Sequence, residues 1–235
     1  MSEPLAPGEV HVWYADPSQG LDGDPRLLAL LTDDERARLA KRSLEGPRRE
    51  YLTTRAMLRL TLSRYVDVAP LAWRFTQGEH GKPSVAAPAL PFHFNLTHTH
   101  GLIALALSRE PELGIDAEAR TRRAPLDIVD RFFAPPEAQP LWALPEDARS
   151  DRFFLLWTLK EAYLKACARG LSVPLSQFWL DLTQPSPRFR FAPELAEDET
   201  RWQALAWRPT PTHQLALALP GRRIPLLRER WVQFG

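Results

Sequence analysis

Hydrophobic and polar positions along this chain follow two different periods, which predict a mixture of helices and strands. Apolar residues spaced for one face of a helix predict helices over residues 32–44, 48–66, 125–133, 135–144 and 150–169. Short apolar or alternating runs predict strands over 9–15, 71–76, 92–98, 102–108, 112–118, 177–183, 187–191, 202–208 and 214–219. We therefore expect an α+β protein.

The two halves of the chain resemble each other. Residues 102–107 read LIALAL and residues 214–219 read QLALAL, while RAMLR at 55–59 resembles EAYLK at 161–165. The matching segments occur in the same order in both halves. The sequence therefore predicts a tandem of two similar halves, residues 1–110 and 111–235, with a site formed between them.

Composition and charge limit the possible classes of protein. A hydrophobic fraction of 44% with 25% charged residues is typical of a globular protein, and a net charge of +1 argues against nucleic-acid binding. No apolar run approaches the roughly 20 residues of a membrane span, and the N-terminus lacks the pattern of a secretory signal. The single cysteine, Cys167, excludes an internal disulfide framework and fits a reducing compartment. We expect a cytoplasmic protein.

Lysine is rare in this chain. Only Lys41, Lys82, Lys160 and Lys165 occur among 30 basic residues. Lysine is a compact point charge where arginine is a planar fork, so a retained lysine can mark a site that needs a compact cation. Chance explains so small a sample equally well.

A pair of acids occupies the segment GIDAE at residues 114–118. On a strand, Asp116 and Glu118 share one face, because side chains at i and i+2 point the same way. Adjacent carboxylates repel unless they are solvated or bridged by a cation. The alternative is a strand edge that turns its acids to water.

A second motif is WTLKEAYLK at residues 157–165. Glu161 and Lys165 lie at i and i+4 of a helix that is apolar on most of its circumference. A surface ion pair is the simpler interpretation, but charges on a buried helix need partners. Asp116, Glu118 and Glu161 together suit Mg²⁺, which takes a few oxygen ligands and completes its octahedron with water and phosphate.

Two further segments favour phosphate binding. Residues 92–100 read FHFNLTHTH, in which Thr97 and His98 would cradle a phosphate. Zinc is disfavoured because the chain has one cysteine and the histidine spacing is not that of a zinc site, while a structural histidine remains the alternative. Residues 78–83, GEHGKP, form a turn that brings Lys82 and backbone close to a ligand without the spacing of a P-loop.

Together these segments resemble the Sfp-type 4′-phosphopantetheinyl transferases. The family pattern combines a GKP turn, an N-[IL]-[ST]-H segment, G-[IV]-D-x-E and W-[ST]-x-K-E-[AS]-[YFL]-x-K, and this chain carries GKP at 81–83, NLTH at 95–98, GIDAE at 114–118 and WTLKEAYLK at 157–165. The RFF at 131–133 also fits, and the resemblance spans about residues 30–180. Ala117 stands where a larger aliphatic residue is usual, and Thr97 where serine is frequent.

The resemblance implies a fold, an activity and a set of site residues. The fold is a pseudo-twofold tandem of two α+β halves with the active site between them. The reaction transfers 4′-phosphopantetheine from coenzyme A to a serine of an apo acyl or peptidyl carrier protein and releases adenosine 3′,5′-bisphosphate. Asp116, Glu118 and Glu161 would hold Mg²⁺; Glu161, Lys165 and Asp116 would be catalytic. The residues expected to bind coenzyme A are Arg48 or Arg49, Lys82, Thr97, His98, Lys160 and Lys165.

Some alternatives remain open from the sequence. Glu161 could act as the base directly, through a metal-bound water, or only as a metal ligand. The basic run of Arg36, Arg38, Lys41 and Arg42 could meet an acidic carrier helix or be a solvated helix face. A Mg²⁺-dependent phosphohydrolase and a non-catalytic module that binds coenzyme A or a carrier are the rival functions. We expect a monomer, with no nucleic-acid or membrane partner.

Overall fold

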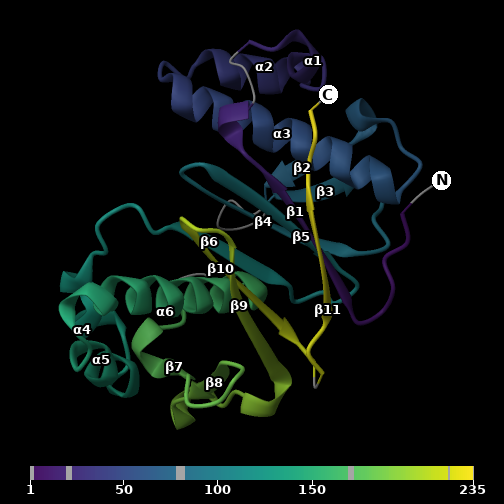
Figure 1. Ribbon diagram of the computed structural model, residues 1–235. Coiled ribbons are helices and arrows are strands. Elements are labelled where there is room, and N and C mark those ends of the chain that lie inside the picture. The colour runs from purple at the N-terminus through teal and green to yellow at the C-terminus, as the bar shows by residue number, and fades with distance from the viewer. Residues whose placement is uncertain (1–2, 20–22, 78–82, 169–171, 222, 235) are drawn as a thin grey trace. The chain divides into compact units, whose positions relative to one another are not determined.

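A computed structural model of the protein describes residues 3–19, 23–77, 83–168, 172–221 and 223–234 (Figure 1). Contacts divide the chain into two units. The first comprises residues 1–96, 101–109 and 226–235, and the second comprises 97–100 and 110–225. In the part of the chain that is described, no helix is long and apolar enough to cross a membrane.

The first unit is built on a sheet of four strands in the order β11-β1-β5-β4. Strand β1 pairs in parallel with β11 and antiparallel with β5, and a separate antiparallel pair joins β2 and β3. Its elements are β1 (Glu9–Ala15), α1 (Pro25–Leu28), α2 (Asp33–Ala40), α3 (Glu45–Tyr65), β2 (Arg74–Gln77), β3 (Pro83–Ala87), β4 (His93–Thr99), β5 (Leu102–Ser108) and β11 (Leu226–Trp231), with 3-10 turns at Pro17–Gln19 and Pro70–Ala72.

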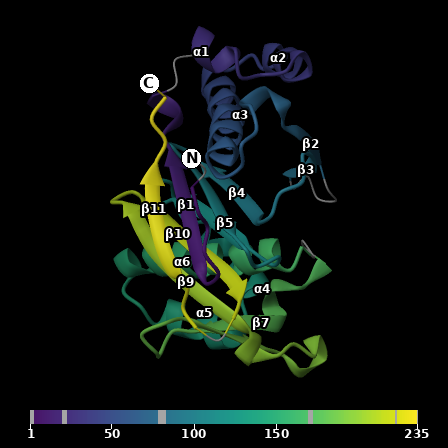
Figure 2. The same ribbon diagram turned by 90° about the vertical axis from the view of Figure 1, so that its right-hand side faces the viewer.

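Helix α3 packs its apolar face on this sheet (Figure 2). Met57, Leu58 and Leu62 lie in one core cluster with Ile103 and Leu105 of β5. Every residue of β5 is buried, as expected for a strand inside a sheet that a helix covers. Burial of these side chains, each contributing about 1.5–3 kcal/mol, holds the helix on the sheet.

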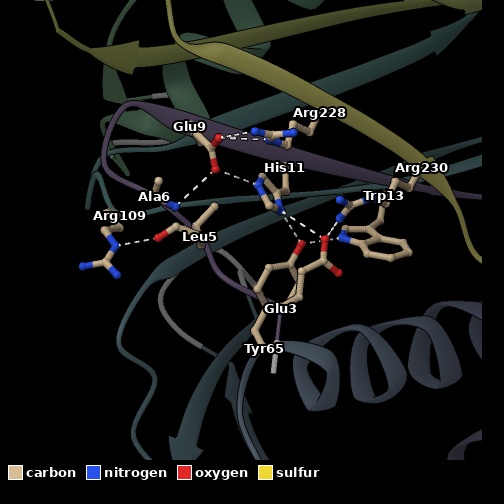
Figure 3. A network of polar contacts seen from close by, with 10 residues as sticks. All are labelled: Glu3, Leu5, Ala6, Glu9, His11, Trp13, Tyr65, Arg109, Arg228 and Arg230. Carbon is tan, nitrogen blue, oxygen red and sulfur yellow. Dashed lines mark hydrogen bonds and ion pairs between the residues drawn. The ribbon is translucent and has the colours of Figure 1, made fainter. Parts of the chain in front are cut away.

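A polar network ties the N-terminal segment, α3 and β11 of the first unit together (Figure 3). The hydroxyl of Tyr65 accepts a hydrogen bond from Trp13 Nε1 at 2.9 Å and lies 2.6 Å from His11 Nδ1. The carboxylate of Glu9 accepts two hydrogen bonds from Arg228, at 2.7 and 2.9 Å. Those bonds to Arg228, with the backbone N–H of Ala6, lower the pKa of Glu9 to about 2.

The second unit contains a three-stranded antiparallel sheet in the order β6-β10-β9 and a two-stranded sheet of β7 and β8. Its elements are β6 (Gly114–Ala119), α4 (Val129–Phe132), α5 (Pro135–Trp142), α6 (Glu146–Ala166), β7 (Phe178–Asp181), β8 (Arg188–Phe191), β9 (Trp202–Thr210) and β10 (His213–Pro220), with 3-10 turns at Leu126–Ile128, Leu175–Gln177, Pro193–Leu195 and Glu199–Arg201. Helix α6 packs against β6 and β10 and is largely buried, as its apolar sequence predicts.

Aromatic side chains form the centre of the second unit. Tyr163 of α6 contacts the rings of Phe178, Phe189, Phe191 and Trp202 at centroid distances of 4.9–5.3 Å. Such contacts contribute about 0.5–1.5 kcal/mol each beyond area burial. They bring α6 together with β7, β8 and β9, so the helix is held on more than one side.

The expectation of an α+β fold is confirmed, and strands β1 and β5 have the predicted bounds. Three elements were not predicted. Helix α1 has four residues, β3 begins with Pro83, and β11 (LLRERW) is mostly exposed and carries three charges. Because β11 pairs with β1, the C-terminal residues belong to the first unit, which differs from the expected division into 1–110 and 111–235.

Candidate active site

The acidic residues of the second unit are brought together by a close approach of β6 and α6. A Cβ atom on Gly114 would lie 2.0 Å from the carbonyl oxygen of Ala162 and 2.4 Å from the backbone nitrogen of Ala166. No side chain fits at that separation, so only glycine allows the strand to lie this near the helix. The approach places Asp116 and Glu118 of β6 beside Glu161 and Lys165 of α6.

Asp116 is the most buried of these acids, and it forms an ion pair with the ammonium group of Lys165. Its Oδ1 atom accepts hydrogen bonds from Lys165 Nζ at 2.7 Å and from Thr97 Oγ1 at 3.2 Å. Lys165 Nζ also donates to Thr97 Oγ1 at 3.1 Å, so the three side chains form a closed triangle. Asp116 is 6% exposed, and its Oδ2 atom is buried with no hydrogen-bond partner among the described residues.

Glu118 lies on the same face of β6, two residues from Asp116. Its carboxylate accepts a hydrogen bond from Arg122 at 2.7 Å. Burial raises the pKa of Glu118, the hydrogen bond from Arg122 opposes that shift, and the charge of Asp116 adds to it. The hydrogen bond from Arg122 therefore offsets only part of the effect of burial on the Glu118 carboxylate.

Glu161 faces the same two carboxylates from α6. Burial, followed by repulsion from Asp116, raises the pKa of Glu161 to about 6, and attraction to Lys165 opposes the shift. Three carboxylates against two cations, Lys165 and Arg122, leave an excess of one negative charge in a poorly solvated place.

The residues present fit a divalent cation with oxygen ligands. The unpartnered Oδ2 of Asp116 and the raised pKa values of Glu118 and Glu161 are features that such an ion would relieve. Mg²⁺ suits the set because it needs few protein ligands. In the described residues, no three His, Cys, Asp or Glu side chains are already arranged around a common metal position, and Asp116 is paired with Lys165 instead.

The remaining residues expected to bind coenzyme A are distributed over the chain. His98 is exposed and follows Thr97 in β4. Arg48 donates to the carbonyl oxygens of Leu39 and Arg42, and Arg49 forms an ion pair with Glu45, all within the first unit. Lys82 lies outside the described residues.

The structure contradicts the expectation that Lys160 binds coenzyme A. Lys160 is fully buried, and its Nζ donates to Glu137 Oε2 and to the carbonyl oxygen of Phe178, both at 2.5 Å. Burial lowers the pKa of Lys160 and raises that of Glu137, while attraction between the two opposes both shifts. The motif spacing could not reveal this, because Glu137 and Phe178 lie far from Lys160 in the sequence.

The sequence also failed to predict a cavity in the first unit. It has a volume of about 650 Å³, and its lining includes four arginines, Arg38, Arg55, Arg59 and Arg74, and three acids, Asp33, Asp34 and Glu35, with Trp73 and Pro83. Glu35 pairs with Arg59 at 2.9 Å, while Arg59 Nε is buried without a hydrogen-bond partner among the described residues. Two signals in the sequence bear on this cavity: the GKP segment, whose Pro83 borders it, and the basic run that includes Arg38. Four guanidinium groups against three carboxylates leave a small positive excess, and guanidinium groups can bind an anionic group.

Comparison with known proteins identifies the family. A sequence model of the 4′-phosphopantetheinyl transferase superfamily matches residues 112–219, which include β6 and α6. The 4′-phosphopantetheinyl transferase HetI of Nostoc sp. is 32% identical over 219 residues, covering 87% of this chain and 92% of that protein. A putative 4′-phosphopantetheinyl transferase of Synechocystis sp. is 31% identical over 78% of this chain and 81% of its own, and Sfp of Bacillus subtilis is 30% identical over 73% and 75%.

The chain belongs to the 4′-phosphopantetheinyl transferase superfamily. It is therefore a transferase, and the resemblance to Sfp inferred from its motifs is confirmed. The matched region contains all four residues of the acidic site: Asp116, Glu118, Glu161 and Lys165.

The raised pKa of Glu161 predicts how the stability of the metal-free protein depends on pH. A carboxyl whose folded-state pKa is about 6, above its ordinary 4.5, favours folding below pH 4.5, and this contribution is lost as the pH rises through 6. The wild type should therefore lose about 2 kcal/mol of its free energy of unfolding through this group between pH 4.5 and pH 7.5, whereas Glu161→Gln, which does not titrate there, should not show this loss. Denaturant unfolding in EDTA at both pH values measures this. An identical pH dependence in the variant and the wild type would contradict the assignment.

Proposed function

We propose that this enzyme transfers the 4′-phosphopantetheine arm of coenzyme A to a serine hydroxyl of an apo carrier protein. The serine oxygen forms a bond to the phosphorus that bears the pantetheine, the bond from that phosphorus to the bridging oxygen of the pyrophosphate breaks, and adenosine 3′,5′-bisphosphate leaves with the bridging oxygen. The observation that carries the proposal is the part-buried triangle of Asp116, Lys165 and Thr97 beside two further carboxylates. Phosphoryl transfer requires charge neutralisation and positioning more than covalent chemistry, and this cluster can supply both.

Asp116, Glu118 and Glu161 would hold a Mg²⁺ ion. When bound, the ion neutralises charge on the pyrophosphate. Lys165 would add its ammonium to the same pyrophosphate, since its Nζ lies 2.7 Å from Asp116 Oδ1 and its side chain is 31% exposed. Thr97 fixes the position of Lys165 by accepting its hydrogen bond.

Glu161 is the group best suited to accept the serine proton. A base works best when its pKa lies near the operating pH, and the pKa of about 6 for Glu161 is closer to neutrality than that of an ordinary carboxyl. Proton transfer from the serine to Glu161, directly or through one water, keeps the reaction balanced. Asp116 serves as a charge partner instead, because Lys165 and Thr97 already bind its Oδ1.

The nucleotide end of coenzyme A carries further negative charge, and the first unit offers an arginine-lined cavity for it. Arg38 and Arg55 line that cavity beside Pro83, the last residue of the GKP sequence motif, in which Lys82 precedes it. We assign the 3′-phosphate to these arginines, with His98 and Arg48 or Arg49 as further candidate contacts. Forked guanidinium groups bind phosphate oxygens in pairs, which suits this role.

The partners follow from this reaction. Coenzyme A and an apo acyl or peptidyl carrier protein are the substrates, and we propose that a monomer acts in the cytoplasm. No observation favours the phosphohydrolase or the non-catalytic binding module that the motifs alone also allowed.

Mass spectrometry of an apo carrier incubated with coenzyme A, Mg²⁺ and the enzyme tests the function. The carrier should gain one phosphopantetheine, about 340 Da, and excess EDTA should abolish the gain.

Asp116→Asn should lower the rate at least about 10²-fold, because it removes a principal electrostatic group. Asp181→Asn, on β7 and paired with Arg190, is the matched control and should retain the wild-type rate. Consumption of coenzyme A without modification of any carrier would favour the phosphohydrolase.

The assignment of the 3′-phosphate has its own test. Arg38→Ala should raise the KM for coenzyme A by about 10-fold or more, as expected for loss of a hydrogen bond to a charged group, and change the KM for dephospho-coenzyme A little. The exposed Arg188 of β8 provides the control variant Arg188→Ala, which should change neither value. Equal losses for both substrates would show that the cavity does not hold the 3′-phosphate.

A further inference from the structure

Lys160 and Glu137 form a fully buried ion pair in the second unit. Both side chains are 0% exposed, and Lys160 Nζ lies 2.5 Å from Glu137 Oε2. Lys160 comes directly before Glu161 on α6, and Glu137 belongs to α5. Burying a charged pair costs desolvation free energy, so such a pair is stable only when hydrogen bonds satisfy its remaining polar atoms.

Those hydrogen bonds all reach one edge of β7. Lys160 Nζ donates to the carbonyl oxygen of Phe178, and the backbone N–H of Leu180 donates to Glu137 Oε1 at 2.8 Å. Strand β7 pairs with β8, Phe178 lying opposite Phe191 and Leu180 opposite Phe189. The ion pair therefore supplies hydrogen-bond partners for two backbone groups of β7, and it links α5, α6 and β7 at one point.

Two contacts hold α6 from nearly opposite sides. Successive residues of an α-helix are turned by roughly 100°, so Lys160 points about 140° away from the face that contains Ala162 and Ala166. That face meets Gly114 of β6 at backbone contact distance. Glu161 and Lys165 project between these two contacts, and the ion pair adds directional hydrogen bonds to the ring contacts that Tyr163 makes on the same helix.

We propose that Glu137 and Lys160 are positioning residues of the transfer reaction, which set the rotation of α6 and thereby the placement of Glu161 and Lys165. The inference rests on the proposed function, because it assigns the two α6 side chains their roles in that reaction. Neither Glu137 nor Lys160 touches the substrate, since both are fully enclosed by the second unit.

The magnitude of the effect follows from helix geometry. Side-chain ends lie about 5–6 Å from the axis of a helix, so a rotation of about 10° moves the Glu161 carboxylate by about 1 Å. A misplacement of about 1 Å at a reacting centre can cost on the order of 10²-fold in rate. A small loss of rotational order in α6 is therefore enough to impair the transfer without unfolding the protein.

The ion pair can be replaced in a way that separates positioning from stability. Apolar residues of similar volume are often neutral for stability at a buried ion pair, whereas removing one partner alone is strongly destabilising. The double variant Glu137→Leu/Lys160→Met should therefore melt above either single variant but several degrees below the wild type, because the Phe178 carbonyl and the Leu180 N–H lose their partners, and each single variant should melt roughly 10 °C below the wild type. The apolar pair cannot bind the Phe178 carbonyl or the Leu180 N–H, so the rotation of α6 is less well defined.

The closing experiment compares kcat and KM of these variants, well below their melting temperatures, on a carrier that the wild type modifies. The double variant should lose at least about 10-fold in kcat while KM for coenzyme A and for the carrier stays within about 2-fold. If the double variant does not fold, Glu137→Asp, which keeps the charge but shortens the side chain, should show the same loss of kcat. Wild-type kcat in a folded double variant, or in Glu137→Asp, would overturn the proposal.

Tyr65→Phe provides the matched control for lost stability. Tyr65 is a buried residue of the first unit whose hydroxyl binds His11 and Trp13 (Figure 3). The variant should melt at a lower temperature yet keep the wild-type kcat; a fall in kcat equal to that of the Glu137 and Lys160 variants would mean that lost stability alone explains the effect. Failure of the wild type to modify any carrier would instead reject the proposed function.

Discussion

The acidic site of this transferase depends on one steric constraint, the close approach of β6 and α6 at Gly114. A Cβ atom there would lie 2.0 Å from the carbonyl oxygen of Ala162, so the strand can lie this near the helix backbone only where the strand carries glycine. The contact decides the distance between a strand that presents Asp116 and a helix that presents Lys165, and those two side chains meet at 2.7 Å. Backbone packing thus sets the geometry in which the charges act.

The second feature of the site is a charge imbalance held in a poorly solvated place. Lys165 compensates Asp116 and Arg122 compensates Glu118, yet burial and mutual repulsion still raise the pKa of Glu118 and bring that of Glu161 to about 6. Such a cluster costs folding free energy in the absence of a cation, and a bound divalent ion or substrate repays that cost. The same excess charge that lowers stability is the basis on which we propose a Mg²⁺ site here, and it raises the pKa of Glu161 toward the range that suits a base.

Local patterns predicted the parts of the site that lie on regular elements. Asp116 and Glu118 were placed on one strand face by the period of two, and Glu161 and Lys165 on one helix face by the i, i+4 spacing, and the structure has them so. Lys160 was misassigned because its partners, Glu137 and Phe178, come from segments whose sequence shows no relation to it. The arginine cavity was missed for the same reason, since α2, α3 and β2 contribute its residues and only tertiary packing collects them. Strand β11 was missed because its exposed, charged sequence lacks the pattern of a buried strand.

The most direct test of this account is the transfer rate of Gly114→Ala, measured with Mg²⁺ below the melting temperature of the variant. Gly46→Ala is the matched control, because a Cβ atom at that position in α3 meets nothing within 4 Å. The account predicts that Gly114→Ala, by pushing α6 away from β6, lowers kcat on the order of 10²-fold, while Gly46→Ala leaves kcat unchanged. A folded Gly114→Ala enzyme with wild-type kcat would contradict the claim that this contact assembles the reacting site.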